Sequence, residues 1–179
     1  MKIRVYGPCG SGKSYFSKKL AKALSITLYV TDNMIWNRSI NEKFSREDRE
    51  KNLDQVLALE SWIIEGAQYK WSFNSFLEAD IIIHIDPRPL RLTQRVTWRY
   101  VKMKFGIETF NYTQSLKELF EMYVQNHEYY KETKHDFDHR IKARGLNTIL
   151  LKDSDLNDSV TSMIIRKFEE IDQQIDCCR

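Results

Sequence analysis

Short apolar segments alternate with longer amphipathic segments along this chain of 179 residues. The short segments are rich in isoleucine, valine and leucine, which is typical of strands that are buried on both faces of a sheet. We predict five strands, at residues 2–6, 27–30, 62–64, 79–85 and 148–151.

The longer segments repeat apolar residues every three or four positions, which is the period of a helix with one buried face. We predict helices at residues 14–24, 45–59, 90–104, 113–131 and 135–144, and a closing helix with an apolar stripe between Val160 and Ile175. Ser45 and Asp48 form an S-x-x-D capping pattern at the start of the second helix. Strands separated by helices predict an α/β fold, in which a parallel sheet is covered by helices on both faces.

The residues VYGPCGSGKS, at positions 5–14, connect the first predicted strand to the first predicted helix. Gly7, Gly12, Lys13 and Ser14 follow the spacing G-x-x-x-x-G-K-S, with Gly10 between them. Glycine allows backbone angles and close approaches that a side chain would block. A turn of this kind points several backbone N–H groups, and the positive end of a helix, at one spot where a polyphosphate can bind. The spacing and its position between a strand and a helix indicate the phosphate-binding loop of a nucleotide-binding protein.

In this loop Lys13 would reach the terminal phosphates of a nucleotide, and the Ser14 hydroxyl would complete the shell of a magnesium ion. The alternative is a glycine-rich turn that only packs. The residues expected to contact the nucleotide run from the first glycine into the helix: Gly7, Pro8, Cys9, Gly10, Ser11, Gly12, Lys13, Ser14 and Tyr15.

Composition narrows the class of protein. Hydrophobic residues make up 42% of the chain and no linker interrupts it, so we predict one globular domain over residues 1–179. The net charge of +3 is too small to indicate nucleic-acid binding by itself. Cys9, Cys177 and Cys178 offer no disulfide framework, and no apolar run reaches membrane length. We therefore expect a cytoplasmic protein that does not enter a membrane.

Three acidic residues follow predicted strands, at the edge of a parallel sheet where ligands bind. Glu65, which precedes a glycine, could hold magnesium through water, or could cap a helix or lie in a solvated loop. Asp32 could orient a phosphate acceptor or serve as its base, and capping of the next helix is the alternative. For Asp86, which precedes Pro87, we predict a cap on the basic helix that follows.

That basic helix carries no acidic residue between positions 87 and 104. Arg88, Arg91, Arg95 and Arg99 recur at intervals of three and four residues, which gives one basic face. Arginines there could neutralise phosphates of a nucleotide or contact the backbone of a nucleic acid. We favour the nucleotide, because the phosphate-binding loop indicates one independently.

Taken in order, several segments resemble the adenylate-kinase-like P-loop kinases, and more narrowly the bacterial group of DNA topology modulation proteins. These segments are GPCGSGKS at 7–14, VTDNMIW at 30–36, WIIEG at 62–66, ADIIIHIDP at 79–87 and RVTWR at 95–99. The resemblance implies a three-layer P-loop NTPase fold with a five-stranded parallel sheet of order 2-3-1-4-5. It also implies a helical, lid-like insertion around residues 105–145 and ATP with Mg²⁺ as cofactors. Arg95 and Arg99 would be lid-hinge arginines that neutralise the transferring phosphates.

The chain departs from the family pattern on the side of the phosphate acceptor. Asn37, Arg38 and Ser39 stand where a Pro-Gly pair is usual, and Lys70 is the only cation soon after the Glu-Gly pair. No arginine-rich lid is evident between Gly106 and Thr113. These departures leave ATP binding untouched and leave the acceptor open.

Two functions are compatible with these features. The first is an ATP- and Mg²⁺-dependent phosphotransferase that acts on a nucleotide or another small metabolite. Its predicted catalytic residues are Lys13, Asp32, Glu65, Arg95 and Arg99, with Ser14 and Glu65 at the metal. The second is a non-enzymatic ATP-binding regulator linked to DNA topology, with direct DNA binding possible but not favoured.

Overall fold

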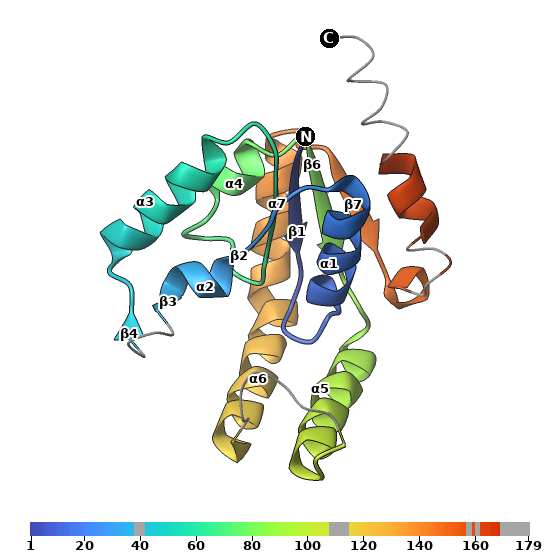
Figure 1. Ribbon diagram of the computed structural model, residues 1–179. Coiled ribbons are helices and arrows are strands. Elements are labelled where there is room, and N and C mark those ends of the chain that lie inside the picture. The colour runs from blue at the N-terminus through green and yellow to red at the C-terminus, as the bar shows by residue number, and fades with distance from the viewer. Residues whose placement is uncertain (38–41, 108–114, 157–158, 160–161, 169–179) are drawn as a thin grey trace.

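The computed structural model describes residues 1–37, 42–107, 115–156, 159 and 162–168. Five strands form one sheet in which every neighbouring pair is parallel. The sheet order is β2-β5-β1-β6-β7, with β1 at the centre (Figure 1). The strands are β1 (Lys2–Tyr6), β2 (Leu28–Val30), β5 (Trp62–Gly66), β6 (Ile81–Ile85) and β7 (Thr148–Leu151).

The observed strand numbers, 2-5-1-6-7, differ from the predicted 2-3-1-4-5, although the five strands of the sheet, counted by themselves, lie in the predicted arrangement. The numbers differ because two more strands, β3 (Trp36–Asn37) and β4 (Glu42–Lys43), lie between β2 and β5 in the chain. They pair with each other as a separate antiparallel sheet. Strands of two residues show no alternation of apolar and polar side chains, so the pattern of the sequence does not reveal them.

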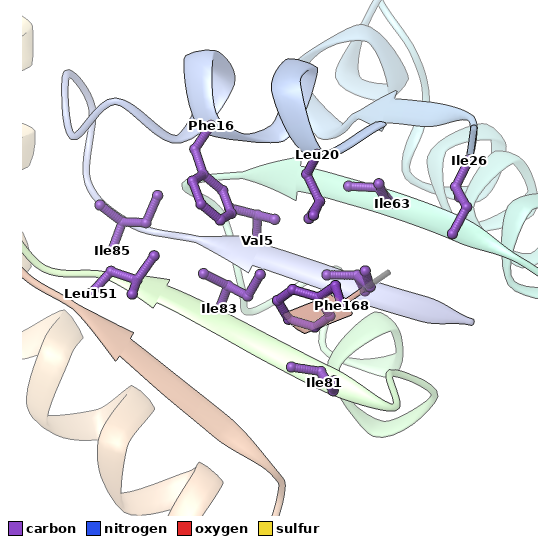
Figure 2. Packing of buried hydrophobic residues seen from close by; sticks show 11 residues of the cluster. Val5, Phe16, Leu20, Ile26, Ile63, Ile81, Ile83, Ile85, Leu151 and Phe168 are labelled. Carbon is purple, nitrogen blue, oxygen red and sulfur yellow. The ribbon is translucent and has the colours of Figure 1, made fainter. Parts of the chain in front are cut away.

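Helices cover both faces of the sheet (Figure 1). On one face, α1 (Lys13–Leu24) and the helical residues 162–168 pack over the apolar side chains of the strands. Figure 2 shows this cluster, with Phe16 and Leu20 of α1 above Val5 and Ile63. On the other face lie α3 (Arg46–Leu57), α4 (Asn74–Leu77) and α7 (Lys134–Ala143).

Two further helices, α5 (Pro89–Lys104) and α6 (Leu116–Glu128), extend side by side beyond the sheet (Figure 1). Ser115 and Glu118 form a reciprocal capping box at the start of α6. α6 then continues without a break through the π-helix η1 (Tyr129–Thr133) into α7. The sequence predicts two separate helices here, at 113–131 and 135–144, and residues 113 and 114 lie outside the described part of the chain.

The predicted helix cap at Asp86 is wrong, and so is the alternative by which Asp32 caps the helix after it. Val30 is the N-cap of the short helix α2 (Thr31–Ile35), and Asp32 lies inside its first turn. Arg88 is the N-cap of α5, and its backbone N–H donates to Asp153, 2.7 Å away. Asp86 instead pairs with Lys134 of α7, at 2.5 Å. The predicted cap on α3 is present, because Ser45 Oγ accepts from the backbone N–H of Asp48.

Within the described ranges, no helix combines the length and the apolar character needed to cross a membrane.

Candidate phosphate-binding site

The loop between β1 and α1 depends on glycine at two positions in particular. Gly10 has a φ of 83°, and a Cβ atom there would lie 2.6 Å from the side chain of Val96 in α5. A Cβ atom on Gly7 would lie 2.4 Å from the carbonyl oxygen of Ile85. Side chains at these positions would push the loop away from β6 and α5. The loop is therefore closed tightly against its surroundings.

Polar contacts hold the carbonyl groups of this loop. The Cys9 carbonyl accepts from Asn126 Nδ2 of α6 at 3.2 Å, and the Ser11 carbonyl accepts from Arg95 Nη1 of α5 at 3.3 Å. The Pro8 carbonyl accepts from Lys13 Nζ at 3.3 Å. Lys13 therefore lies folded over its own loop, with its ammonium group beside the helix start.

Glu65 lies next to the start of α1. Parallel pairing aligns Glu65 of β5 with Val5 of β1 and with Val30 of β2, so its position on the sheet is fixed from both sides. Its carboxylate accepts from the Ser14 hydroxyl at 3.0 Å. Glu65 is only 4% exposed, and its second oxygen, Oε2, is buried without a partner among the described residues. A hydroxyl and an unsatisfied carboxylate are oxygen donors of the kind that Mg²⁺ takes, directly or through water. These residues therefore fit a magnesium site.

A cleft of about 830 Å³ opens above the loop. Most of the predicted site residues line it: Cys9, Gly10, Gly12, Lys13, Ser14, Tyr15, Asp32, Glu65, Arg95 and Arg99. Gly7, Pro8 and Ser11 are not part of the lining, and all three are buried. Asn33, from the segment VTDNMIW, also lines the cleft, as do Lys18 and Met122, which lie outside the sequence motifs.

Two helices, α2 and α5, bring opposite charges to this cleft. Asp32 and Asn33, both exposed, come from α2 on one side. Arg95 and Arg99 come from α5, and Arg99 Nη2 donates to Met122 Sδ of α6 at 3.3 Å. Arg99 Nε is buried without a partner among the described residues. A guanidinium held only by a thioether keeps donors available for an anion.

A second cleft, of about 910 Å³, lies on the other side of Arg95. Arg95 lines both clefts and also forms an ion pair with Asp153, at 3.2 Å. Arg88 and Arg91 line the second cleft and not the first, so the predicted basic face of α5 is divided between two sites. Trp98 and Tyr130 add aromatic surface to the second cleft.

A buried polar network lies beneath the end of β6. His84 Nε2 is 2.6 Å from the Tyr129 hydroxyl, and His84 Nδ1 is 3.6 Å from Asp138. Burial lowers the pKa of His84, because desolvation disfavours the charged imidazolium more than nearby carboxylates favour it. The π-helix η1 contributes Tyr129 to this network, and the next residue, Tyr130, donates to the Pro87 carbonyl. The network therefore ties α6 and α7 to the strand end that leads into α5.

Comparison with solved structures identifies the fold. No protein-family model matches the chain, and no curated protein sequence matches it. Shikimate kinase from Bacteroides thetaiotaomicron is 14% identical over 97% of this chain and 98% of its own, with a TM-score of 0.58. Shikimate kinase from Aquifex aeolicus is 15% identical over 97% and 99%, with a TM-score of 0.53. Deoxyadenosine kinase from M. mycoides with bound dATP is 15% identical over 94% and 100%, with a TM-score of 0.50.

The chain has the fold of a small P-loop kinase. At these identities the likeness concerns the fold, and the chemistry of the site has to be argued from its own residues.

Proposed function

We propose that the protein is an ATP-dependent kinase that transfers the terminal phosphoryl group of Mg²⁺-ATP to a nucleotide or another small metabolite. The observation that carries this proposal is the hydrogen bond between Ser14 and the buried Glu65 at the base of the loop cleft. Ser14 directly follows the loop lysine, and the second carboxylate oxygen of Glu65 has no partner among the described residues. That pair is what a magnesium-bound polyphosphate needs beside it.

Each part of the cleft has a role in this proposal. The N–H groups of the loop and the Lys13 ammonium bind the β- and γ-phosphates. Ser14 and Glu65 would hold Mg²⁺, Glu65 through water, and the ion would neutralise phosphate charge. The nucleoside lies in the second cleft, since Arg95 lines both clefts and Trp98 and Tyr130 offer aromatic surface to a base.

The acceptor enters from the side of α2. For a hydroxyl acceptor, its oxygen forms the new bond to the terminal phosphorus while the bond from that phosphorus to ADP breaks. Asp32 takes the proton of the hydroxyl, and Asn33 can bind neighbouring polar groups of the acceptor. Arg95 and Arg99 neutralise the charge that is shared between the attacking and leaving oxygens.

The test is ADP release by the wild-type chain with panels of nucleosides, nucleoside monophosphates and small alcohols. We expect at least one acceptor to stimulate release above the ATP-only rate. ATP binding without stimulation by any acceptor would contradict the kinase and favour a non-enzymatic ATP-binding regulator.

Lys13→Ala tests the loop itself. Among the described residues, the lysine ammonium bonds to its own loop, at the Pro8 carbonyl, so its loss removes a charged hydrogen bond to phosphate and little packing. We expect ATP affinity to fall about 10- to 100-fold, as for other hydrogen bonds to charged groups, with an unchanged midpoint of thermal unfolding. Calorimetric titration with Mg²⁺-ATP measures the affinity. Equal affinity in the variant and the wild type would overturn the assignment of the loop.

A further inference from the structure

Two helices hold the phosphate loop from outside. α5 contacts it through Arg95, which donates to the Ser11 carbonyl, and through Val96, which packs against Gly10. α6 contacts it through the side chain of Asn126, which donates to the Cys9 carbonyl at 3.2 Å. Cys9 and Asn126 are 117 positions apart in the chain, so this contact joins two distant segments.

The geometry of the peptide unit gives this contact a consequence. The carbonyl of Cys9 and the N–H of Gly10 belong to one planar, trans peptide unit, in which the two groups point in opposite directions. A donor that holds the carbonyl toward α6 therefore turns the N–H away from α6. Cys9 and Gly10 line the phosphate cleft, and Asn126 does not. The contact with Asn126 thus fixes the direction of the Gly10 N–H, a donor of a residue that lines the cleft.

The surroundings of Asn126 show that stability alone does not account for it. The residue is 7% exposed, and its Oδ1 atom is buried with no partner among the described residues. The amide cannot be reversed, because Oδ1 would then face the Cys9 carbonyl oxygen. A buried acceptor without a partner is destabilising, and an apolar side chain of the same shape would avoid that cost.

Asn126 also stands on a helix face that is fixed in place. One turn earlier, the Tyr123 hydroxyl is 2.6 Å from Thr97 Oγ1 of α5, and Met122 accepts from Arg99. One turn later, Tyr129 contacts His84 of β6. Contacts on the turns before and after Asn126 therefore fix the part of α6 from which its amide reaches the Cys9 carbonyl.

We propose that Asn126 is a positioning residue for nucleotide binding, which acts by holding the Cys9–Gly10 peptide unit with its N–H toward the phosphates. The inference rests on the proposed function, because it requires a nucleotide at this loop. A loop N–H contacts phosphate in the ground state and in the transition state alike. Loss of Asn126 therefore weakens ATP binding and raises KM more than it lowers kcat.

The decisive variant is Asn126→Leu, which keeps the shape of the side chain and removes both its donor and its unpartnered oxygen. We expect ATP affinity to fall roughly tenfold, as for one lost hydrogen bond, while the midpoint of thermal unfolding stays the same or rises. Calorimetry with Mg²⁺-ATP and thermal unfolding without nucleotide measure the two quantities. Gln125→Leu is the matched control, since Gln125 is the exposed neighbour on the same helix and should leave both unchanged.

A second variant tests the donor directly. In Asn126→Asp the carboxylate cannot donate to the Cys9 carbonyl, but the protonated acid can, and burial raises the pKa of such a carboxyl. We expect this variant to bind ATP weakly at about pH 8. Its affinity, divided by that of the wild type at the same pH, should rise as the pH is lowered to about 5.5.

The outcomes separate this inference from the proposed function. If the wild type fails to bind ATP, the proposed function is overturned, and the inference with it. If the wild type binds ATP and Asn126→Leu binds it equally well, only the inference is overturned. Parallel losses of affinity and thermal stability in Asn126→Leu would make the residue structural and would also overturn it.

Discussion

Among single residues, Glu65 combines deep burial with an unused oxygen, and the Ser14 hydroxyl satisfies only the other half of its carboxylate. If Glu65 orients Mg²⁺ through water, Glu65→Gln should keep ATP binding but lower Mg²⁺-dependent turnover by about 10- to 100-fold, the usual effect of removing an outer-shell partner of a metal. Steady-state ADP release at several Mg²⁺ concentrations measures the effect. Unchanged turnover would show that Glu65 only holds the Ser14 hydroxyl in place.

Among the described residues, Arg99 has no acidic partner, and its guanidinium donates to the sulfur of Met122. Arg99→Lys keeps the positive charge and loses the planar fork that binds two phosphate oxygens. We expect ATP affinity to stay within about threefold, while turnover falls about 100-fold or more, as for other lost transition-state donors. Stopped or continuous assays of ADP release, together with calorimetry, separate the two quantities. Full turnover in the variant would make Arg99 a surface charge.

The sequence predicts the loop residues and the strand-end carboxylates because their positions follow from local spacing. Gly7, Gly12 and Lys13 identify the loop, and Glu65 follows from the end of a strand. Asn126 and Met122 have no such signal. An asparagine inside a helical segment is unremarkable by itself, and its role depends on a contact made across 117 positions of chain.

At the scale of elements, the continuous run from α6 through η1 to α7 connects the loop to the network beneath β6. A π-helix contains an extra residue in its turn, which shifts the side chains that follow onto a different face. Here it allows Tyr129 to reach His84 and Tyr130 to reach Pro87. The helical period in the sequence predicts both flanking helices, but an extra residue inside one turn leaves no trace in that period.

This network makes stability depend on pH. Because burial lowers the pKa of His84, the unfolded chain binds a proton under conditions where the folded protein does not. The free energy of unfolding should therefore decrease as the pH falls below about 6.5, by up to about 1.4 kcal/mol per pH unit from this residue. Urea unfolding at a series of pH values measures it.

His84→Gln is the control for this dependence. The amide can keep the hydrogen bond to the Tyr129 hydroxyl but does not titrate. Asp138, Asp86 and Lys134 also face His84 and remain in the variant. We expect a shallower loss of stability toward low pH than in the wild type, and equal slopes would exclude His84 as the source.

For the whole molecule, the alternation of strands and helices predicts the layers of the fold. The short strands β3 and β4 are not predicted from the sequence, and they change only the numbering of the strands.

One residue of the sheet departs from its apolar pattern. Arg4, in the central strand, is fully buried, and burial lowers its pKa to about 10. Its guanidinium donates to the carbonyls of Val5, Ile64 and Gln68, so it connects β1, β5 and the loop after Glu65. The sequence shows an arginine inside a strand, but not the carbonyl groups that surround it.

The central position of β1 also matters while the chain is being made. β1 is the first of the five sheet strands to be synthesised, yet its neighbours are β5 and β6, which begin only at Trp62 and Ile81. Until those strands emerge from the ribosome, the apolar side chains of Ile3 and Val5 have no sheet to join, and the chain depends on distant contacts that form slowly. The phosphate loop also waits for α5 and α6, which hold its carbonyl groups. A nucleotide bound at this loop would therefore stabilise the nascent chain only after α6 has been made, and it would not guide the earlier steps of folding.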